Sequence, residues 1–396
     1  MNTLLLIASL SAAPGSAQFL QPEQSDWTSN PTLLSSKVVQ PVTANRNRDS
    51  VQFSWALGAD EAIASQTGLS ASSKAYWLDV SSQALAKGVD LPLTSGGAVI
   101  RISPVGKAQL DPGTLTLFGD GEPLGKSAVR HFADADELAK TGAGFSKGSV
   151  AFRLADEVSP TQLTLALGSA SKSSEPYVVH VFEPRSTLEL AVHSDRARAL
   201  AGGTHAFRLA IDGLALAASD VTGYVAAPGG ERLGDLKFSA SGGGIDGTVV
   251  LGESATTSAG LWEAHLFVKA QGKSGVVMRD VKLPFQVIAP TAAFAPKVTH
   301  SDFAFDLQLQ VAQEGRFEAR GILFGSMADG TMVPVAAAAS ADWLAPGQQS
   351  LSLAFDRQHV LASDAQAPYE VRFLELKDQS RMFGLWHQER AILIDP

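Results

Sequence analysis

The stretch DVKLPFQVIAPTAAFAPKVTHSDFAFDLQLQV, residues 280–311, contains two strand patterns separated by a proline-bounded joint. From Phe303 to Val311 every second residue is apolar, which is the period-two pattern of a strand with one buried face. Residues 281–287, before Pro290, alternate in the same way. An α-helix would scatter these residues around its axis, so the pattern predicts β-rich domains that meet at a short joint.

The same layout occurs earlier in the chain, in YVVHVFEPRSTLELAVHSD at residues 177–195. Each copy has an alternating strand, a proline, a short link and then the tripeptide His-Ser-Asp. Pro184, Pro290 and Pro396 are spaced about a hundred residues apart, which is the length of one immunoglobulin-like sandwich. A repeat of this length exceeds that of solenoid proteins and is typical of tandem domains that each have their own core.

We therefore predict an all-β chain of three tandem β-rich domains. The last two are predicted to be immunoglobulin-like antiparallel sandwiches. The first is predicted to be a β-sandwich with one or two short helices, at Asp134–Lys140, where Asp134 and Glu137 form a capping box, and in SSQALAKG at residues 81–88. The predicted divisions are a signal peptide at 1–17, an extended leader at 18–50, and domains at 51–184, 185–289 and 290–396.

Composition narrows the possible functions. The 396 residues are 45% hydrophobic, which is enough to bury several cores. The net charge is −9, without a long run of either sign, so a nucleic-acid partner is not expected because phosphate binding needs a local basic excess. The chain has no cysteine, which excludes disulfides, thiol catalysis and thiolate metal sites.

The N-terminal residues MNTLLLIASLSAAPGSA resemble a secretory signal, with an apolar run at Leu4–Ala13 and small residues Gly15 and Ala17 before a cleavage point. The alternative is a buried N-terminal strand or helix, and no Lys or Arg precedes the apolar run as signals usually require. No later apolar run reaches the length of about 20 residues that a membrane span needs. Export without cysteine favours a bacterial periplasmic or secreted protein.

One catalytic motif occurs, at residues 144–148, where Gly-Phe-Ser-Lys-Gly matches the G-x-S-x-G pattern around Ser146. That chemistry needs the serine on a turn between a strand and a following helix. Here the motif lies between a predicted helix and a following strand, in a β-rich domain. We therefore interpret it as a loop and not as a nucleophile.

Metal and triad motifs are also weak. The acids of residues 119–122 and of 134–137 do not supply the ligand set of an EF-hand, so they are interpreted as a turn and a helix cap. His193 and His300 are each followed by Ser and Asp, but three consecutive residues on a strand point to alternating faces. We interpret these tripeptides as structural, and we predict no metal, no cofactor and no catalytic residue.

Aromatic side chains are the remaining candidates for a binding site, because flat rings can stack on sugars. Trp262 alternates with apolar residues and is predicted to be core. Trp386 follows Phe383-Gly384, and Trp343 lies in the loop-like SADWLAPG, so these two are the candidate exposed aromatics for binding. The alternative for both, which is the commoner role of a tryptophan, is packing in a core or at a sheet edge. Trp27 stands alone in the polar leader and is predicted to dock on a neighbouring domain.

Residues 72–106 and 177–195 together resemble a family of exported bacterial proteins that have a domain of unknown function followed by tandem immunoglobulin-like domains. The resemblance covers most of the chain after the signal and rests on hydrophobic framing. The resemblance implies an all-β multidomain fold and export, and it implies no active-site residues.

These observations favour an exported, cofactor-free protein that binds a protein or a glycan at the cell surface or in the envelope. A secreted hydrolase, or its glycan- or peptide-binding accessory module, with its site in the first domain, is the second hypothesis. A rigid structural spacer is the third, because the proline joints are short. The sequence favours a protein without enzymatic activity but does not exclude an enzyme, and it does not determine the oligomeric state.

Overall fold

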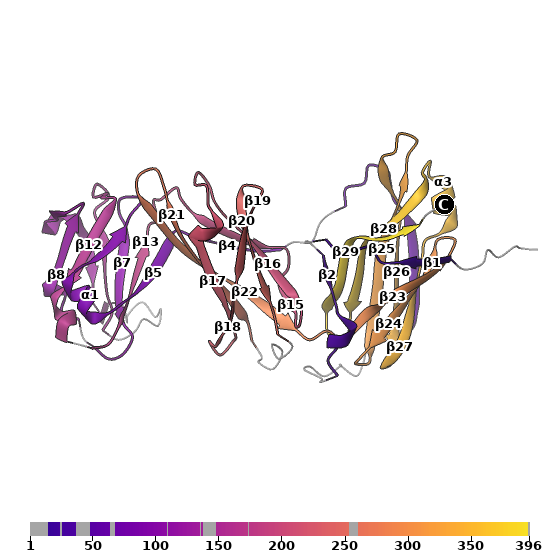
Figure 1. The fold of residues 1–396 in the computed structure, drawn as a ribbon, viewed down its shortest axis with the longest axis horizontal. Coiled ribbons are helices and arrows are strands. Elements are labelled where there is room, and N and C mark those ends of the chain that lie inside the picture. The colour runs from indigo at the N-terminus through magenta and orange to yellow at the C-terminus, as the bar shows by residue number, and fades with distance from the viewer. Residues whose placement is uncertain are drawn as a thin grey trace, which may run out of the picture.

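The structure, a computed structural model, describes residues 15–23, 26–36, 48–63, 68–108, 110–134, 136–137, 148–172, 174–252 and 260–394. Over these residues the chain is almost entirely β, as the sequence predicts, and its six sheets pair into three sandwiches. Figure 1 shows the three sandwiches in a row, with the first and third at opposite ends. No helix in these ranges is long and apolar enough to cross a bilayer.

The first sandwich packs a sheet of five strands against a sheet of four. The first sheet has the order β10 (Val129–Ala133), β11 (Val150–Leu154), β7 (Val99–Pro104), β13 (Tyr177–Phe182), β5 (Ala75–Val80). The second has the order β6 (Val89–Pro92), β12 (Gln162–Leu167), β8 (Leu115–Gly119), β9 (Glu122–Pro123). Alternate apolar residues of both sheets fill the core between them.

Helix α1 (Ser82–Lys87) covers one end of this core and confirms the helix predicted in SSQALAKG. The Ser81 hydroxyl accepts the Ala84 N–H at 3.2 Å, and Gly88 ends the helix with φ 121°, a conformation that favours glycine. Of the second predicted helix, Ala135 and residues 138–140 lie outside the described residues. The Asp134 carboxylate accepts the N–H groups of Asp136 and Glu137, which are the first bonds of the predicted cap.

The middle sandwich has two sheets of five strands. One has the order β19 (Lys237–Ser241), β20 (Gly244–Val250), β16 (Thr204–Ile211), β14 (Leu190–Ser194), β4 (Leu69–Ser73). The other has the order β15 (Arg198–Leu200), β22 (Val276–Ile288), β21 (Trp262–Gln271), β17 (Val221–Ala226), β18 (Arg232–Asp235). All pairings are antiparallel except that of β15 with β22. Trp262 lies in this core, as predicted.

The third sandwich packs a sheet of four strands against a sheet of six. One sheet has the order β1 (Gly15–Gln18), β23 (Ala292–Ser301), β24 (Ala304–Val311), β27 (Gly347–Ala354). The other has the order β2 (Trp27–Thr28), β29 (Phe383–Ile394), β28 (Gln366–Asp378), β25 (Gly315–Ser326), β26 (Met332–Leu344), β3 (Val51–Ala56). Helix α3 (Arg357–Ala362), which the sequence did not predict, follows β27 and begins at the capping carboxylate of Asp356.

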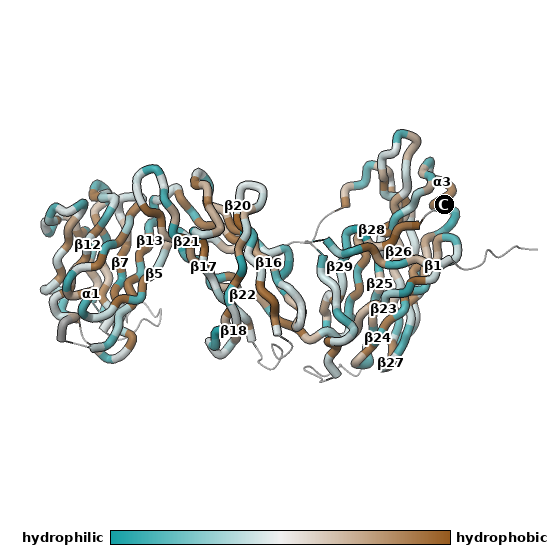
Figure 2. The backbone as a smooth tube through the Cα atoms, viewed as in Figure 1, coloured by the Kyte–Doolittle hydropathy of each residue, from teal (hydrophilic) through white to brown (hydrophobic). Residues whose placement is uncertain are grey.

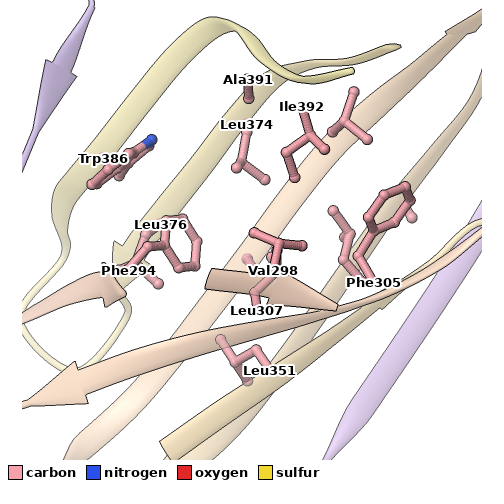
Figure 3. Packing of buried hydrophobic residues seen from close by; sticks show 14 of the residues in the cluster. Phe294, Val298, Phe305, Leu307, Leu351, Leu374, Leu376, Trp386, Ala391 and Ile392 are labelled. Carbon is pink, nitrogen blue, oxygen red and sulfur yellow. The ribbon is translucent and has the colours of Figure 1, made fainter. Parts of the chain in front are cut away.

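Short 3-10 turns complete the secondary structure, at Pro31–Leu33, Pro112–Thr114, Lys126–Ala128, Gly168–Lys172 and Ala218–Asp220. The brown, hydrophobic segments in Figure 2 follow the strands of all three sandwiches, as expected when alternate residues face a core. Figure 3 shows this packing in the third sandwich, where Phe294, Leu307 and Leu376 from different strands converge.

The N-terminal segment does not form the predicted leader. Strands β1, β2 and β3 add to three sheet edges of the third sandwich, so the indigo β2 lies beside β29, near the end of the chain, in Figure 1. Trp27 stacks on His387 with ring centroids 4.5 Å apart, which is the docking predicted for it. Residues 1–14 lie outside the described residues, so the signal peptide itself stays a prediction. Its predicted end at residue 17 is corrected, because Gly15–Gln18 forms β1 and pairs with β23.

The strand at Val51–Ala56, placed by the sequence at the start of the first domain, pairs instead with β26 of the third sandwich. The next strand, β4, joins the middle sandwich beside β14, and the first sandwich begins only with β5. The predicted boundary at residue 51 is corrected for a simple reason: alternation identifies a strand, but it does not identify the sheet edge that accepts it.

Candidate functional site

A pocket of about 230 Å³ lies where the middle sandwich meets the first. Its wall from the first sandwich is Trp77 on β5, and the rest comes from β17, β18, β21 and β22. The long β21–β22 hairpin reaches across this junction, since Met278 near its tip is part of the core of the first sandwich. The pocket is therefore formed by two domains that share a core contact.

An ion pair buried between the two domains holds the hairpin in place. Arg279 on β22 and Glu183, which follows β13, are both fully buried, and Nη1 lies 2.7 Å from Oε2. The guanidinium also donates to the Thr94 and Ser186 hydroxyls, both at 2.9 Å, and to the Leu188 carbonyl at 2.8 Å. Every group of this cluster belongs to the seam between the sandwiches, so the cluster fixes the pocket walls relative to each other.

The pocket walls are aromatic rings with cations above them. The Lys282 ammonium lies 4.7 Å from the centre of the Trp77 ring. On the opposite side, Tyr224 and His265 stack with centroids 4.7 Å apart, and the Arg232 guanidinium lies 4.6 Å above the tyrosine ring. These cation–π contacts hold the rings in fixed orientations.

Two titratable groups of the pocket have perturbed proton affinities. Burial raises the pKa of Asp280 to about 6, against the opposing effects of the Trp77 backbone N–H and the Lys282 charge. Its Oδ2 atom is buried without a hydrogen-bond partner. Burial and the nearby Lys282 charge lower the pKa of His265, while Glu263, whose carboxylate lies 2.9 Å from Nε2, acts in the opposite direction. Such groups in a cleft are typical of functional sites.

The two tryptophans that the sequence proposed for binding lie elsewhere. Trp386 is a correction: it is only 8% exposed, packs against Phe19 and Phe294, and points into the core of the third sandwich in Figure 3. It lies on the inward face of β29, and the nearby Gly384 is what made this segment resemble a loop in the sequence. Trp343 is half-buried, and the Arg48 guanidinium covers its ring at 4.3 Å. Neither residue is near the pocket.

Sequence reasoning missed Trp77 as a site residue. It is 38% exposed on the outer face of β5, while Tyr76 before it is fully buried. The signal was present in AYWLDV, where Trp77 and Asp79 share one face of the strand. The other walls come from β17, β18 and the β21–β22 hairpin, about 150 to 200 residues further along the chain, and no local pattern indicates that they lie beside β5.

The weaker motifs keep their structural interpretation where they are described. Asp120 accepts hydrogen bonds from the Thr161 hydroxyl and the Gln162 N–H, which fixes a β-turn and lowers the pKa of Asp120. Residues 144–147 of the G-x-S-x-G motif, which include Ser146, lie outside the described residues. Within the described ranges, no group of three or more His, Asp or Glu side chains gathers as a metal site would require.

Comparison with known proteins gives a family and a fold. Profiles of the N-terminal and C-terminal domains of the DUF4785 family, a domain of unknown function, match residues 42–183 and 291–395. No curated protein matches the chain.

Among solved structures, a DUF4785 family protein from Legionella pneumophila is 19% identical, with a TM-score of 0.53 over 95% of this chain and 98% of that one. Trypsin-activated α-2-macroglobulin from Escherichia coli is 14% identical, with a TM-score of 0.20 over 74% of this chain and 22% of that one. The adhesin domain of Epf from Streptococcus pyogenes is 12% identical, with a TM-score of 0.17 over 51% of this chain and 71% of that one. The last two are too dissimilar to support any argument.

The two profiles match in order over more than half of the chain, and the solved family member shares the arrangement of the whole chain. The chain therefore belongs to the DUF4785 family.

Proposed function

We propose that this chain is an exported binding protein of the bacterial envelope or secretome, and that it binds a glycan in the pocket between its first and middle sandwiches. Support for export is the apolar run Leu4–Ala13 followed by small residues. Cell fractionation of the native producer tests this part, with the protein expected in the periplasm or the medium.

The observation that carries the binding proposal is the pairing of aromatic faces with hydrogen-bonding groups in one cleft. Trp77, which is 38% exposed, offers a ring of the size that stacks on a sugar, and Arg232 and Lys282 line the same cleft with hydrogen-bond donors. A small pocket with apolar walls and a few convergent polar groups is the usual form of a ligand site. The volume of about 230 Å³ suits one sugar unit of a longer glycan.

The test is a glycan array followed by calorimetry with the glycan that binds best. Trp77→Ala should weaken binding by about 5- to 150-fold, because the loss of one stacking ring removes about 1–3 kcal/mol. Trp55→Ala is the matched control, since Trp55 is similarly exposed, at 43%, but lies on the third sandwich. Binding that Trp55→Ala weakens and Trp77→Ala leaves unchanged would move the site away from this pocket.

A rigid spacer is the second candidate function, and a separate observation favours it. The Arg279–Glu183 pair joins the first and middle sandwiches, while Leu200 and Ile288 of the middle sandwich belong to the core of the third. Both joints are therefore packed and not flexible linkers. Small-angle scattering that fits a single extended conformation would support a spacer role, and a broad range of shapes would exclude it.

A further inference from the structure

A second cluster of reactive side chains lies on the outer face of the middle sandwich, away from the aromatic pocket. Ser70 on β4 is directly opposite His193 on β14 in the antiparallel pairing. The Ser70 hydroxyl is 2.9 Å from His193 Nδ1, and His193 Nε2 is 3.0 Å from Asp195 Oδ1. The three side chains form one line of hydrogen bonds, and all three are exposed to solvent.

The carboxylate sets the proton position on the imidazole. Because a carboxylate oxygen only accepts, Nε2 must carry the proton that bonds to Asp195. In the neutral ring, Nδ1 then has a free lone pair, and it faces the Ser70 hydroxyl. This is the tautomer in which histidine can take a proton from serine, and the carboxylate stabilises the charge that results.

The second copy of the His-Ser-Asp tripeptide shows what is particular about the first. His300 on β23 occupies the corresponding place in the third sandwich, but the residue opposite it on β1 is Gly15. The His300 ring stacks on Phe305. In the first copy, Ser194 is buried and donates to the Ala206 carbonyl at 2.9 Å. The serine of the tripeptide is therefore structural, and the reactive hydroxyl comes from β4, 123 residues earlier in the chain.

A hollow of about 380 Å³ lies beside Ser70 on the same face. It is open because small side chains occupy the next row of the sheet, where Ser72, Ala191 and Ala210 are opposite one another. Arg208, opposite His193 on β16, lies at the rim of the hollow, where its guanidinium pairs with Asp246 and donates to the Ser241 and Gly242 carbonyls. A short acyl group fits such a shallow space better than a long chain does.

We propose that Ser70 is the nucleophile of an acyl-transfer site, with His193 as its general base and Asp195 as the positioning residue, and that its substrates are esters of short acyl groups. This goes beyond glycan binding and is independent of the aromatic pocket. It is also a different site from the first-domain hydrolase site that the sequence left as an alternative.

The reaction balances with the groups present and water. The Ser70 oxygen attacks the ester carbonyl carbon while its proton moves to His193 Nδ1. The bond from that carbon to the alkoxy oxygen then breaks, and the leaving alcohol takes the proton from Nδ1. Water next attacks the acyl-serine and gives a proton to Nδ1, and Ser70 leaves with that proton as the carboxylic acid is released.

Ser70 lies within an extended strand and not on a strand-to-helix elbow, so we expect slow turnover and choose covalent labelling as the assay. The full-length protein is treated with a fluorophosphonate, and the modified residue is identified by peptide mass spectrometry. Ser70 should react about a hundredfold faster than Ser72, which lies on the same face of β4 but donates to Glu189 and has no imidazole beside it.

Four variants complete the test, each checked for unchanged thermal unfolding. His193→Gln should lower the Ser70 labelling rate about a hundredfold, because general-base assistance is lost. Asp195→Asn should also slow it, and Asp195→Glu should restore it, which a purely structural role would not produce. Ser72→Ala should have no effect. Equal labelling of Ser70 and Ser72, or an unchanged Ser70 rate in His193→Gln, would overturn the proposal.

Discussion

Removing one member of the buried pair between the first two sandwiches should be the most damaging single change at this joint. In Glu183→Ala, the fully buried Arg279 guanidinium loses the carboxylate 2.7 Å away. The variant also removes the acceptor for the Thr94 hydroxyl and the Ser95 N–H, at 3.0 and 2.9 Å. An unpaired buried charge costs about 3–5 kcal/mol, so we expect the free energy of unfolding to fall by that amount.

Urea denaturation measures this loss, and hydrogen exchange locates it. Exchange should speed up at Thr94–Ser95 and along the β21–β22 hairpin, and far less in the third sandwich. Glu157→Ala, which breaks the exposed pair with Arg130, is the control and should cost under about 1 kcal/mol. A loss in Glu183→Ala no larger than in this control would refute the reasoning. Replacing both partners by methionine should recover most of the stability, because no charge is then left unpaired.

Three further predictions concern other parts of the molecule. Trp386→Ala should destabilise the protein by about 3–5 kcal/mol in urea denaturation, while Trp343→Ala should cost much less, because only the first ring is buried in a core. The pKa of Asp280 is raised to about 6, so between about pH 4 and 6 the folded state keeps a proton that the unfolded state loses. The free energy of unfolding should therefore fall as the pH rises from about 4 to 6. Asp280→Asn should flatten this dependence in thermal melts recorded at a series of pH values. Gly202→Val should lower the melting temperature, because residue 202 has φ 77°, which side chains rarely adopt, and a Cβ there would meet the Leu33 side chain.

The sequence predicted the class of the fold well because every sandwich depends on local alternation. Residues 304–311, for example, alternate between half-buried and buried without exception, as their apolar pattern requires. Helix α1 was predictable for the same reason, since its serine cap and its closing glycine lie within one short segment. Local chemistry determined both features.

The errors arise where a distant partner decides the outcome. The pattern of Val51–Ala56 correctly indicates a strand, but only the free edge of β26 determines which sheet receives it. In the same way, Trp386 lies between Leu385 and His387 without a clear alternation, and packing against Phe19 decides that it is core. The serine of the proposed acyl-transfer site was missed because the tripeptide around His193 directed attention to its own serine and not to a strand 123 residues away.

The path of the chain links stability to the proposed functions. The N-terminal segment begins in the third sandwich, gives β4 to the middle one and then enters the first, after which the chain returns through the middle sandwich to the third. Two of these early strands lie directly opposite the repeated histidines, with Gly15 at His300 and Ser70 at His193. An edge strand supplied from elsewhere in the chain can change its residues without disturbing the core strands that it covers. The sandwiches can therefore keep a repeated frame while these added strands determine what each frame presents on its surface.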